Sequence, residues 1–379
     1  MIEGPRAAKF DELPQVIHLV NEVFMTGLDA PPVLGKFFPQ LFNEHNLENL
    51  RVMVEDGKPI SHVGIWEGDL VVYGSWFKVG MIGCVCTDQD YRGRGYASAL
   101  MKDAFVKMGK DGVDVAFVTG FRSLYRRVGY VEAGRVHVYH ISAGTLGSRK
   151  ERFQVVPYTP DKVQELVGIY QREPVRYRRT LEDWKLLLER DLHCQDILLR
   201  TFAAAEAEKP IAYISVGLVP DEKQVRVFEY AGSARAVLYL LENAFETMHI
   251  DTIELDVPFQ DFELLNLLEA QGLSKPPSEA QMSTAIIDPV RFLEKAIPYL
   301  EERIGRQRPF EVEPIEAGKL RMKVRREEKE LDPEAFTVLF FGKPERLKSG
   351  NQPELDLDQT LGLARALPLP TPVFGLTYV

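Results

Sequence analysis

The chain has 379 residues, of which 45% are hydrophobic and 27% are charged, and its formal net charge is −10. This composition fits a globular protein of two or three domains, excludes a fibrous or generally disordered chain, and disfavours nucleic-acid binding. No apolar run approaches the roughly 18 residues of a membrane span, and the N-terminus lacks the features of a signal peptide, so we expect a cytoplasmic protein.

Cysteine content argues against a disulfide framework and against a zinc site. The chain has three cysteines, Cys84, Cys86 and Cys194. The Cys84-x-Cys86 pair has no His or Cys partners at metal-ligand spacing. We therefore expect reduced thiols that serve packing, and no motif requires a metal.

Residues 1–145 predict an α/β unit. Alternating apolar patterns and turn residues indicate the boundaries of its elements. Glu67-Gly68-Asp69 is typical of a hairpin turn between two of the strands. Helices are expected at Leu13–Met25 and within Leu34–Asn49, and strands at Arg51–Val54, Ser61–Trp66, Leu70–Trp76, Val79–Thr87, Val113–Thr119 and Val136–Ile141.

A glycine-rich loop, Asp90 to Ala97, stands between the Val79–Thr87 strand and an amphipathic helix. Gly93 and Gly95 allow the backbone to approach a ligand, and the first N–H groups of a helix attract an anion. The loop matches neither the P-loop nor the dinucleotide-binding fingerprint. We interpret it as a cradle for a pyrophosphate; the alternative is a plain turn with two solvated arginines.

Residues 151–280 repeat the order of the first unit. Helices are expected at Asp161–Tyr170 and Leu181–Arg190, and strands at Pro210–Val216, Val225–Tyr230 and Thr252–Val257. Where a glycine loop would recur, Glu229 to Ala236 has one glycine and lacks the spacing, so this copy is expected to be non-catalytic. The basic stretch Arg172–Arg179 indicates a solvated face or an interface.

Residues 285–379 predict a small α+β unit after a turn-rich boundary at Gly272–Ser278. An apolar helical stripe is followed by strand-like segments at Glu311–Val324 and Phe336–Phe341. The final residues, Leu367 to Val379, are apolar and rich in proline. Because such a segment is unusual for a free end, we expect it to dock on the protein.

The loop Arg92-Gly93-Arg94-Gly95-Tyr96-Ala97 resembles the Gln/Arg-x-x-Gly-x-Gly/Ala signature of GCN5-related N-acetyltransferases (GNAT). Together with the segment Leu124–Tyr130 and the order of the three units, it makes the chain similar to the enhanced intracellular survival (Eis) type of acetyltransferase. The resemblance implies an α/β (α+β) fold: tandem GNAT-like domains, the second degenerate, and then a small domain like a sterol carrier protein.

That resemblance also implies an activity. The protein would pass acetyl from acetyl-CoA directly to a primary amine, such as an aminoglycoside, a polyamine or a lysine. It would act as a homo-oligomer, and hexamers are known among relatives. Residues 92–97 would bind the pyrophosphate, backbone groups of Val85, Cys86 and Thr87 would pair with pantetheine, Tyr125 would protonate the departing thiolate, and the C-terminal carboxylate of Val379 would act as the general base.

Several alternatives stay open at the level of sequence. Val85 to Thr87 fit a plain core strand, Tyr125 fits a packing role, and Val379 fits an ordinary docked tail. A non-catalytic protein that binds acyl-CoA or lipid is the alternative function, and an acyl group longer than acetyl would leave the loop unchanged. The acidic residues Glu22, Asp29 and Glu44 could attract a cationic acceptor, although no pattern places them in a pocket.

Overall fold

The computed structural model describes residues 1–25, 33–147, 152–189, 198–219, 223–305, 310–324, 327–342 and 365–379. Expectations that fall on Asp29, Arg190 and Cys194 lie outside these ranges. Within them, none of the helices combines the length and apolar character of a membrane-spanning segment.

The first unit follows the predicted order of elements, with an additional N-terminal strand and with the predicted Leu70–Trp76 strand divided between its two neighbours. Helix α3 buries Leu100, Met101, Ala104 and Met108 on one face, as its apolar spacing predicts. The elements are β1 (Ile2–Ala7), α1 (Leu13–Met25), α2 (Leu34–Phe37), β2 (Leu50–Glu55), β3 (Lys58–Val72), β4 (Ser75–Thr87), α3 (Tyr96–Lys110), β5 (Val115–Val118), α4 (Ser123–Arg126) and β6 (Val131–Ser142).

The second unit again alternates strands and helices. Its longest helix, α7, has a broad buried face that covers the sheet. The elements are β7 (Gln154–Pro157), α5 (Val163–Tyr170), β8 (Val175–Arg178), α6 (Leu181–Glu189), β9 (Leu198–Glu206), β10 (Lys209–Val219), β11 (Gln224–Gly232), α7 (Ala234–Met248), β12 (Thr252–Pro258), α8 (Phe262–Ala270) and β13 (Ser278–Ile286).

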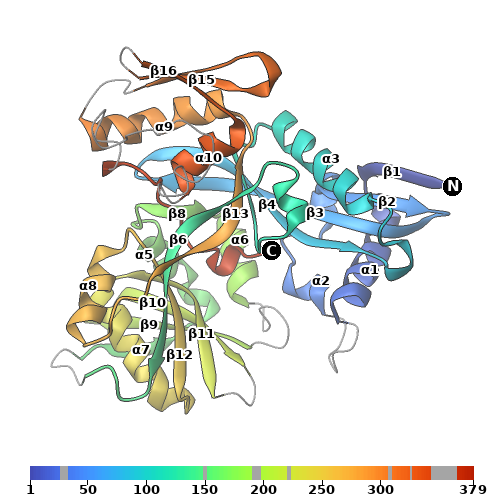
Figure 1. The fold of residues 1–379 in the computed structure, drawn as a ribbon. Coiled ribbons are helices and arrows are strands. Elements are labelled where there is room, and N and C mark those ends of the chain that lie inside the picture. The colour runs from blue at the N-terminus through green and yellow to red at the C-terminus, as the bar shows by residue number, and fades with distance from the viewer. Residues whose placement is uncertain are drawn as a thin grey trace.

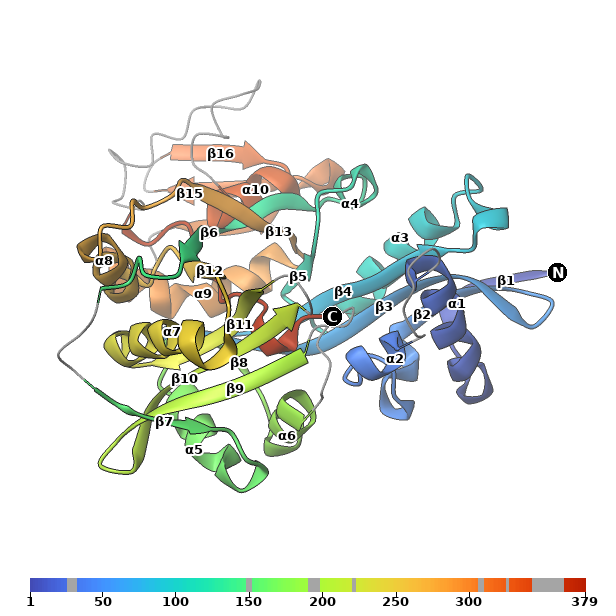
Figure 2. The same ribbon diagram turned by 90° about the horizontal axis from the view of Figure 1, so that it is seen from below.

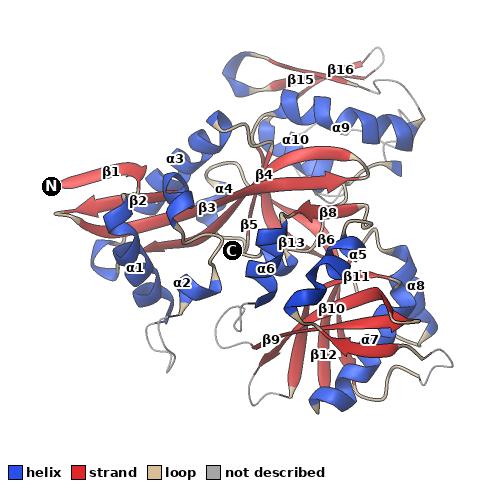
Figure 3. Cartoon of the chain, turned by 180° about the vertical axis from the view of Figure 1, so that it is seen from behind, coloured by secondary structure: helices blue, strands red, loops and turns tan. Residues whose placement is uncertain are grey.

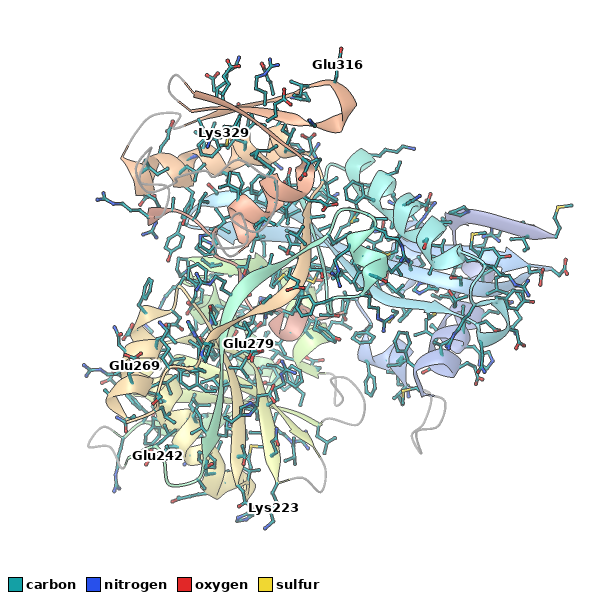
Figure 4. The ribbon with its side chains drawn as sticks, viewed as in Figure 1. Lys223, Glu242, Glu269, Glu279, Glu316 and Lys329 are labelled. Carbon is teal, nitrogen blue, oxygen red and sulfur yellow. The ribbon has the colours of Figure 1, made fainter. Side chains whose placement is uncertain are left out.

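The third unit is small and adds a separate antiparallel sheet, β14-β15-β16. Figure 3 shows this sheet beside helix α9 at one end of the molecule. Charged side chains such as Glu316 on this unit, and Glu269 and Lys223 on the second, point outward (Figure 4). The elements are α9 (Pro289–Ile304), β14 (Glu311–Pro314), β15 (Leu320–Val324), β16 (Glu327–Leu331) and α10 (Pro333–Phe341), and a final 3₁₀ turn, η8 (Gly375–Thr377), lies in the tail.

The first two units share one sheet of 13 strands in the order β1-β2-β3-β4-β5-β13-β6-β12-β11-β10-β9-β7, with β8 paired to β3. Strand β13, from the second unit, inserts between β5 and β6 of the first. Strand β6 then pairs with β12 along residues 136–142. Each unit therefore lends a strand to the other, so the predicted boundary near residue 145 separates stretches of sequence but does not separate two sheets (Figure 1).

The third unit has no core of its own in the described residues. One hydrophobic cluster contains side chains of the first unit, the third unit and the tail. The rings of Phe77 on β4 and Phe292 on α9 stack with centroids 5.1 Å apart, and Phe292 meets Phe340 of α10 at 5.0 Å. The third unit is thus fixed on the first by aromatic packing.

Two local expectations are wrong. Strand β3 runs without a break through Glu67-Gly68-Asp69, and the chain turns instead at Tyr73 and Gly74, both at positive φ. The segment Phe336–Phe341 is helical, because Asp332 caps α10 and Pro333 stands in its first turn. The helix expected within Leu34–Asn49 is present as α2, which ends at Phe37, before Pro39, and a 3₁₀ segment, Glu44–Asn49, follows.

The C-terminal tail docks, as its composition predicts. Residues 366–379 are nearly all buried. The hydroxyl of Tyr299 donates to the carbonyl of Ala366 at 2.8 Å, and the amide of Gln260 donates to the carbonyl of Thr371 at 2.9 Å. The tail therefore touches the third unit and the second, and it ends near the centre of the molecule, as Figures 1 and 2 show.

Candidate active site

The glycine-rich loop borders a cavity of about 670 Å³ between the end of β4, the start of α3 and the α4 turn. Both polar backbone and basic side chains face it. The lining residues are Val23, Phe24, Val85, Cys86, Thr87, Tyr91, Arg92, Gly93, Gly95, Tyr96, Ala97, Ser98, Arg122, Leu124 and Arg127.

The conformation of this loop suits an anion. Gly93 and Gly95 have φ of 78° and 82°, which a side chain would strain, and Gly95 is the N-cap of α3. No side chain among the described residues caps that helix end, and Gly95 to Ser98, whose N–H groups begin the helix, line the cavity. Arg92 donates to the carbonyl of Thr87 at 3.3 Å and Arg94 to that of Asp90 at 3.2 Å, which braces the loop.

Strand β4 bulges just before it reaches the loop. Gly83 pairs with Gly64 and Cys86 with His62, so β4 holds one more residue than β3 there, and Cys84 takes φ 52°. His62 Nδ1 lies 2.9 Å from the carbonyl oxygen of Cys84. Burial lowers the pKa of His62 to about 4. The imidazole is therefore neutral and donates from Nδ1 to the Cys84 carbonyl at the bulge.

Beyond the bulge, β4 and β5 separate. They pair in parallel only where residues 79–82 face residues 115–118. A second cavity of about 260 Å³ opens at this point, and it shares Phe24, Val85 and Arg122 with the first cavity, so the two adjoin. The second cavity is lined by Phe24, Leu34, Phe38, Ile82, Gly83, Cys84, Val85, Val118, Thr119, Arg122, Tyr125, Tyr378 and Val379.

Tyr125 and Val379 meet in this second cavity, although 254 positions separate them in the sequence. Tyr125 comes from α4 and is 4% exposed. Its pKa is raised above 10, because burial disfavours the phenolate more than the charge of Arg122 favours it.

The end of the tail is held against β4. A Cβ placed on Gly83 would lie 2.8 Å from the carbonyl carbon of Val379, so only glycine leaves room there. Gln40 donates its side-chain N–H to the carbonyl of Tyr378 at 2.9 Å. The terminal residue therefore occupies one defined position beside the separated strands.

The structure thus brings nearly all the predicted site residues together. Val85, Cys86, Thr87, Arg92, Gly93, Gly95, Tyr96 and Ala97 line the larger cavity, and Tyr125 and Val379 line the smaller one. Arg94 does not line either; its guanidinium lies over the ring of Tyr91 at 5.0 Å. Burial raises the pKa of Cys86 to about 12, so its thiol is protonated and any role of this residue rests on its backbone.

Sequence reasoning missed several residues of the site. Arg122 and Arg127 add positive charge near the loop, and Gly83 makes room for Val379. The two arginines flank Tyr125 in sequence, which was an available signal, whereas nothing in the pattern marks Gly83. Glu22 lines a neighbouring cavity with Arg92, and Glu44 is exposed. In the described ranges, no group of three or more His, Cys, Asp or Glu side chains is arranged to hold a metal ion.

Comparison with known proteins agrees with this geometry. The family model of the acetyltransferase (GNAT) domain matches residues 5–133. The first unit is therefore a GNAT acetyltransferase domain, and the protein is an N-acetyltransferase of that class, which uses an acyl-CoA. The search of curated proteins found no match.

Over its whole length the chain has the Eis-type fold. It is similar to Eis1 from Mycobacterium abscessus, with a TM-score of 0.64, 16% identity and 100% of each chain covered. A GCN5-related N-acetyltransferase from Anabaena variabilis gives a TM-score of 0.66 at 16% identity, covering 98% of each chain. A probable N-acyltransferase from Enterococcus faecalis gives 0.66 at 17% identity, covering 98% of this chain and 97% of its own.

Proposed function

We propose that the protein transfers acetyl from acetyl-CoA to a primary amine in a ternary complex. The observation that carries the proposal is the position of Tyr125 and Val379 in one cavity, which adjoins the cavity of the glycine-rich loop. A group that can give a proton and a group that can take one would then both lie close to the thioester. Amine acylation needs both, because the attacking amine loses a proton and the departing thiolate gains one.

Binding of acetyl-CoA would use the larger cavity. The pyrophosphate would accept hydrogen bonds from the N–H groups at residues 93–97, with Arg92, Arg122 and Arg127 adding charge. The pantetheine would run along the separated edge of β4 at Val85 to Thr87, where β5 no longer pairs. Backbone N–H groups at the bulge would stabilise the oxyanion that forms on the thioester carbonyl.

Chemistry would take place in the smaller cavity. The amine nitrogen attacks the thioester carbon and loses a proton to the carboxylate that Val379 carries in this sequence. The carbon–sulfur bond then breaks, and the departing thiolate takes its proton from the Tyr125 hydroxyl. A buried phenol with a raised pKa stays protonated near neutral pH, so it is ready for that role.

The acceptor would be a small amine or a lysine-bearing one. The activity is tested by mixing the protein with acetyl-CoA and a panel of aminoglycosides, polyamines and lysine peptides, and following coenzyme A release with a thiol reagent. Turnover with any member supports the proposal. Acetyl-CoA binding without turnover across the panel would favour a non-catalytic acyl-CoA-binding protein.

The role of Val379 is tested by extending the chain. Two glycines added after Val379 move the carboxylate out of the cavity, so kcat is expected to fall at least tenfold while acetyl-CoA still binds. Intact mass measurement confirms the terminus of each protein, and the same two glycines added before Met1 serve as the control. Undiminished turnover of the C-terminal extension would remove Val379 from the mechanism.

A further inference from the structure

The last turn of the tail is fastened to the second unit by a buried ion pair. Arg179 donates to Glu229 from Nη1 at 2.9 Å and from Nη2 at 2.6 Å, and the two side chains are 1% and 4% exposed. The same guanidinium donates to the hydroxyl of Thr377 from Nε at 2.9 Å and from Nη2 at 2.7 Å. Arg179 was expected on a solvated face or an interface; it is instead inside the protein, because these acceptors satisfy it.

The surroundings leave this ion pair little freedom. The guanidinium carbon of Arg179 lies 4.7 Å from the ring centroids of both Tyr170 and Trp184. Glu229 also accepts from the Tyr213 hydroxyl at 2.7 Å and from the N–H of Leu376 at 3.3 Å. Buried ion pairs add little net stability over apolar packing, but a fully bonded one specifies a single arrangement. Here the arrangement includes the backbone and a side chain of the tail.

That arrangement fixes the position of the C-terminal residue, Val379. Thr377 is two residues before Val379, and two residues span at most about 7 Å. The next residue, Tyr378, is held by Gln40 of the first unit, and Val379 then lies against Gly83. Fixing Thr377 therefore confines Val379 to the neighbourhood of the smaller cavity.

The second unit holds the tail at the place that corresponds to the acyl-CoA site of the first. Strands β11 and β12 pair in parallel only where residues 224–227 face residues 252–255, and then separate, as β4 and β5 do. A cavity at this separation is lined by Val227, Phe228 and Asp256 together with Val373, Phe374, Gly375 and Tyr378 of the tail. In the non-catalytic copy, the tail lies where a ligand arm would lie in a catalytic one.

We propose that Arg179, Glu229 and Thr377 are positioning residues, and that the second unit acts as a socket that places the Val379 carboxylate in the catalytic cavity of the first. This inference rests on the proposed function. The tail, rather than a second acyl-CoA, lines the gap between β11 and β12. The second unit is thereby a working part of the active site although it lacks the glycine loop.

The test uses Thr377, because removing either charge of the buried pair could unfold the protein. Thr377→Val keeps the shape and removes the hydroxyl, and Thr377→Ser keeps the hydroxyl. We expect Thr377→Val to lower kcat by about 10- to 100-fold, as small displacements of catalytic groups do, with the KM for acetyl-CoA unchanged. Thr377→Ser should restore kcat to within about threefold of the parent, which a purely space-filling role would not explain.

A second measurement reports how firmly the tail is held and does not depend on turnover. Carboxypeptidase, followed by intact mass, should remove the terminal residues of Thr377→Val at least tenfold faster than those of the parent and of Thr377→Ser. Equal resistance of all three proteins, or a fall in acetyl-CoA affinity in place of kcat, would overturn the positioning role. If the parent acetylates none of the amines, the proposed function fails, and the digestion result alone decides whether the socket holds the tail.

Discussion

Tyr125 carries the buried hydroxyl that is proposed to protonate the departing thiolate. Its phenol lies in the cavity that Val379 also lines, and burial raises its pKa above 10. Tyr125→Phe removes the proton and little else, so kcat is expected to fall by about 10²- to 10⁴-fold while acetyl-CoA affinity stays the same. Coenzyme A release and calorimetric binding measure the two quantities.

The pH profile adds a second check on Tyr125. Because its pKa is raised, any alkaline fall in kcat that reports this phenol should lie above pH 10, and it should be absent in Tyr125→Phe. Equal rates for the parent and the variant would leave Tyr125 with a packing role against Tyr130, whose ring centroid is 6.4 Å away.

His62 makes stability depend on pH. Its pKa is about 4 in the folded protein and 6.5 in the unfolded chain. Above pH 6.5 neither state takes up this proton, whereas between pH 6.5 and 4 only the unfolded chain does, so the free energy of unfolding falls as the pH drops through that window. The loss amounts to about 3 kcal/mol and stops below pH 4, where both states are protonated.

His62→Asn isolates this effect, because an asparagine amide can donate to the Cys84 carbonyl but does not titrate. Denaturant unfolding at pH 7 and pH 5 should show a smaller loss of stability in His62→Asn than in the parent. His45→Asn, at an exposed position, is the matched control and should behave like the parent. The same pH dependence in all three proteins would contradict the role of His62.

Much of the site could be predicted from residues that carry a pattern. The loop at Arg92 to Ala97 follows from glycine spacing between a strand and a helix, and Tyr125 from its flanking segment. Gly83, His62 and Arg179 could not be predicted, because each acts through a partner distant in sequence: Val379, the Cys84 carbonyl and Thr377. Single residues in ordinary strand or basic stretches give no signal of such contacts.

Among the elements, the contact between β4 and the tail decides where the terminal residue lies. Gly83→Ala places a methyl carbon 2.8 Å from the carbonyl carbon of Val379, so the tail must shift. We expect kcat to fall about 10- to 100-fold with unchanged acetyl-CoA binding, because Gly83 does not line the larger cavity. Steady-state kinetics over a range of acetyl-CoA concentrations separate the two effects.

A matched control is Gly57→Ala, in the turn between β2 and β3, where no atom lies within 4 Å of the added carbon. It probes a general response to replacing glycine, although its positive φ adds local strain. A normal kcat in Gly83→Ala would show that the tail tolerates displacement, and the steric argument for Val379 would then fail.

Helices and strands were predicted well where the apolar periodicity was strong. They were predicted poorly where a residue or a short run was compatible with two kinds of local structure. Gly68 suggested a turn, but a Cβ there would lie 2.1 Å from the indole of Trp66, so the glycine makes room for that ring within a continuous strand. The Phe336–Phe341 run suggested a strand because it is apolar, while the Asp332-Pro333 cap that starts α10 is a stronger local signal.

At the scale of the whole molecule, the exchange of β6 and β13 makes the first two units depend on each other. A chain that ends at residue 145 lacks β13 and β12, so both edges of β6 and one edge of β5 lose their partners. We expect this fragment to aggregate rather than fold, as size-exclusion chromatography and circular dichroism would show. A monodisperse fragment that binds acetyl-CoA would contradict the dependence.

The exchange also explains why domain organisation was harder to predict than fold class. The repeated order of elements correctly indicates two copies of one α/β unit. The pairing of β13 with β5 joins residues more than 160 positions apart, and no local pattern encodes such a choice. The likeness of the third unit to a sterol carrier protein and the homo-oligomer stay predictions, and sedimentation measures the latter.

The position of β13 also bears on how the protein is made. On a ribosome that adds about 5–20 residues per second, β13 is synthesised roughly 8–30 s after β5. During that interval β5, which is apolar and buried in the folded protein, has one edge without its β13 partner. Strands of other chains can pair with that edge. The protein is therefore expected to need chaperone protection at this stage of translation, and slowing translation between residues 118 and 278 should lower its soluble yield.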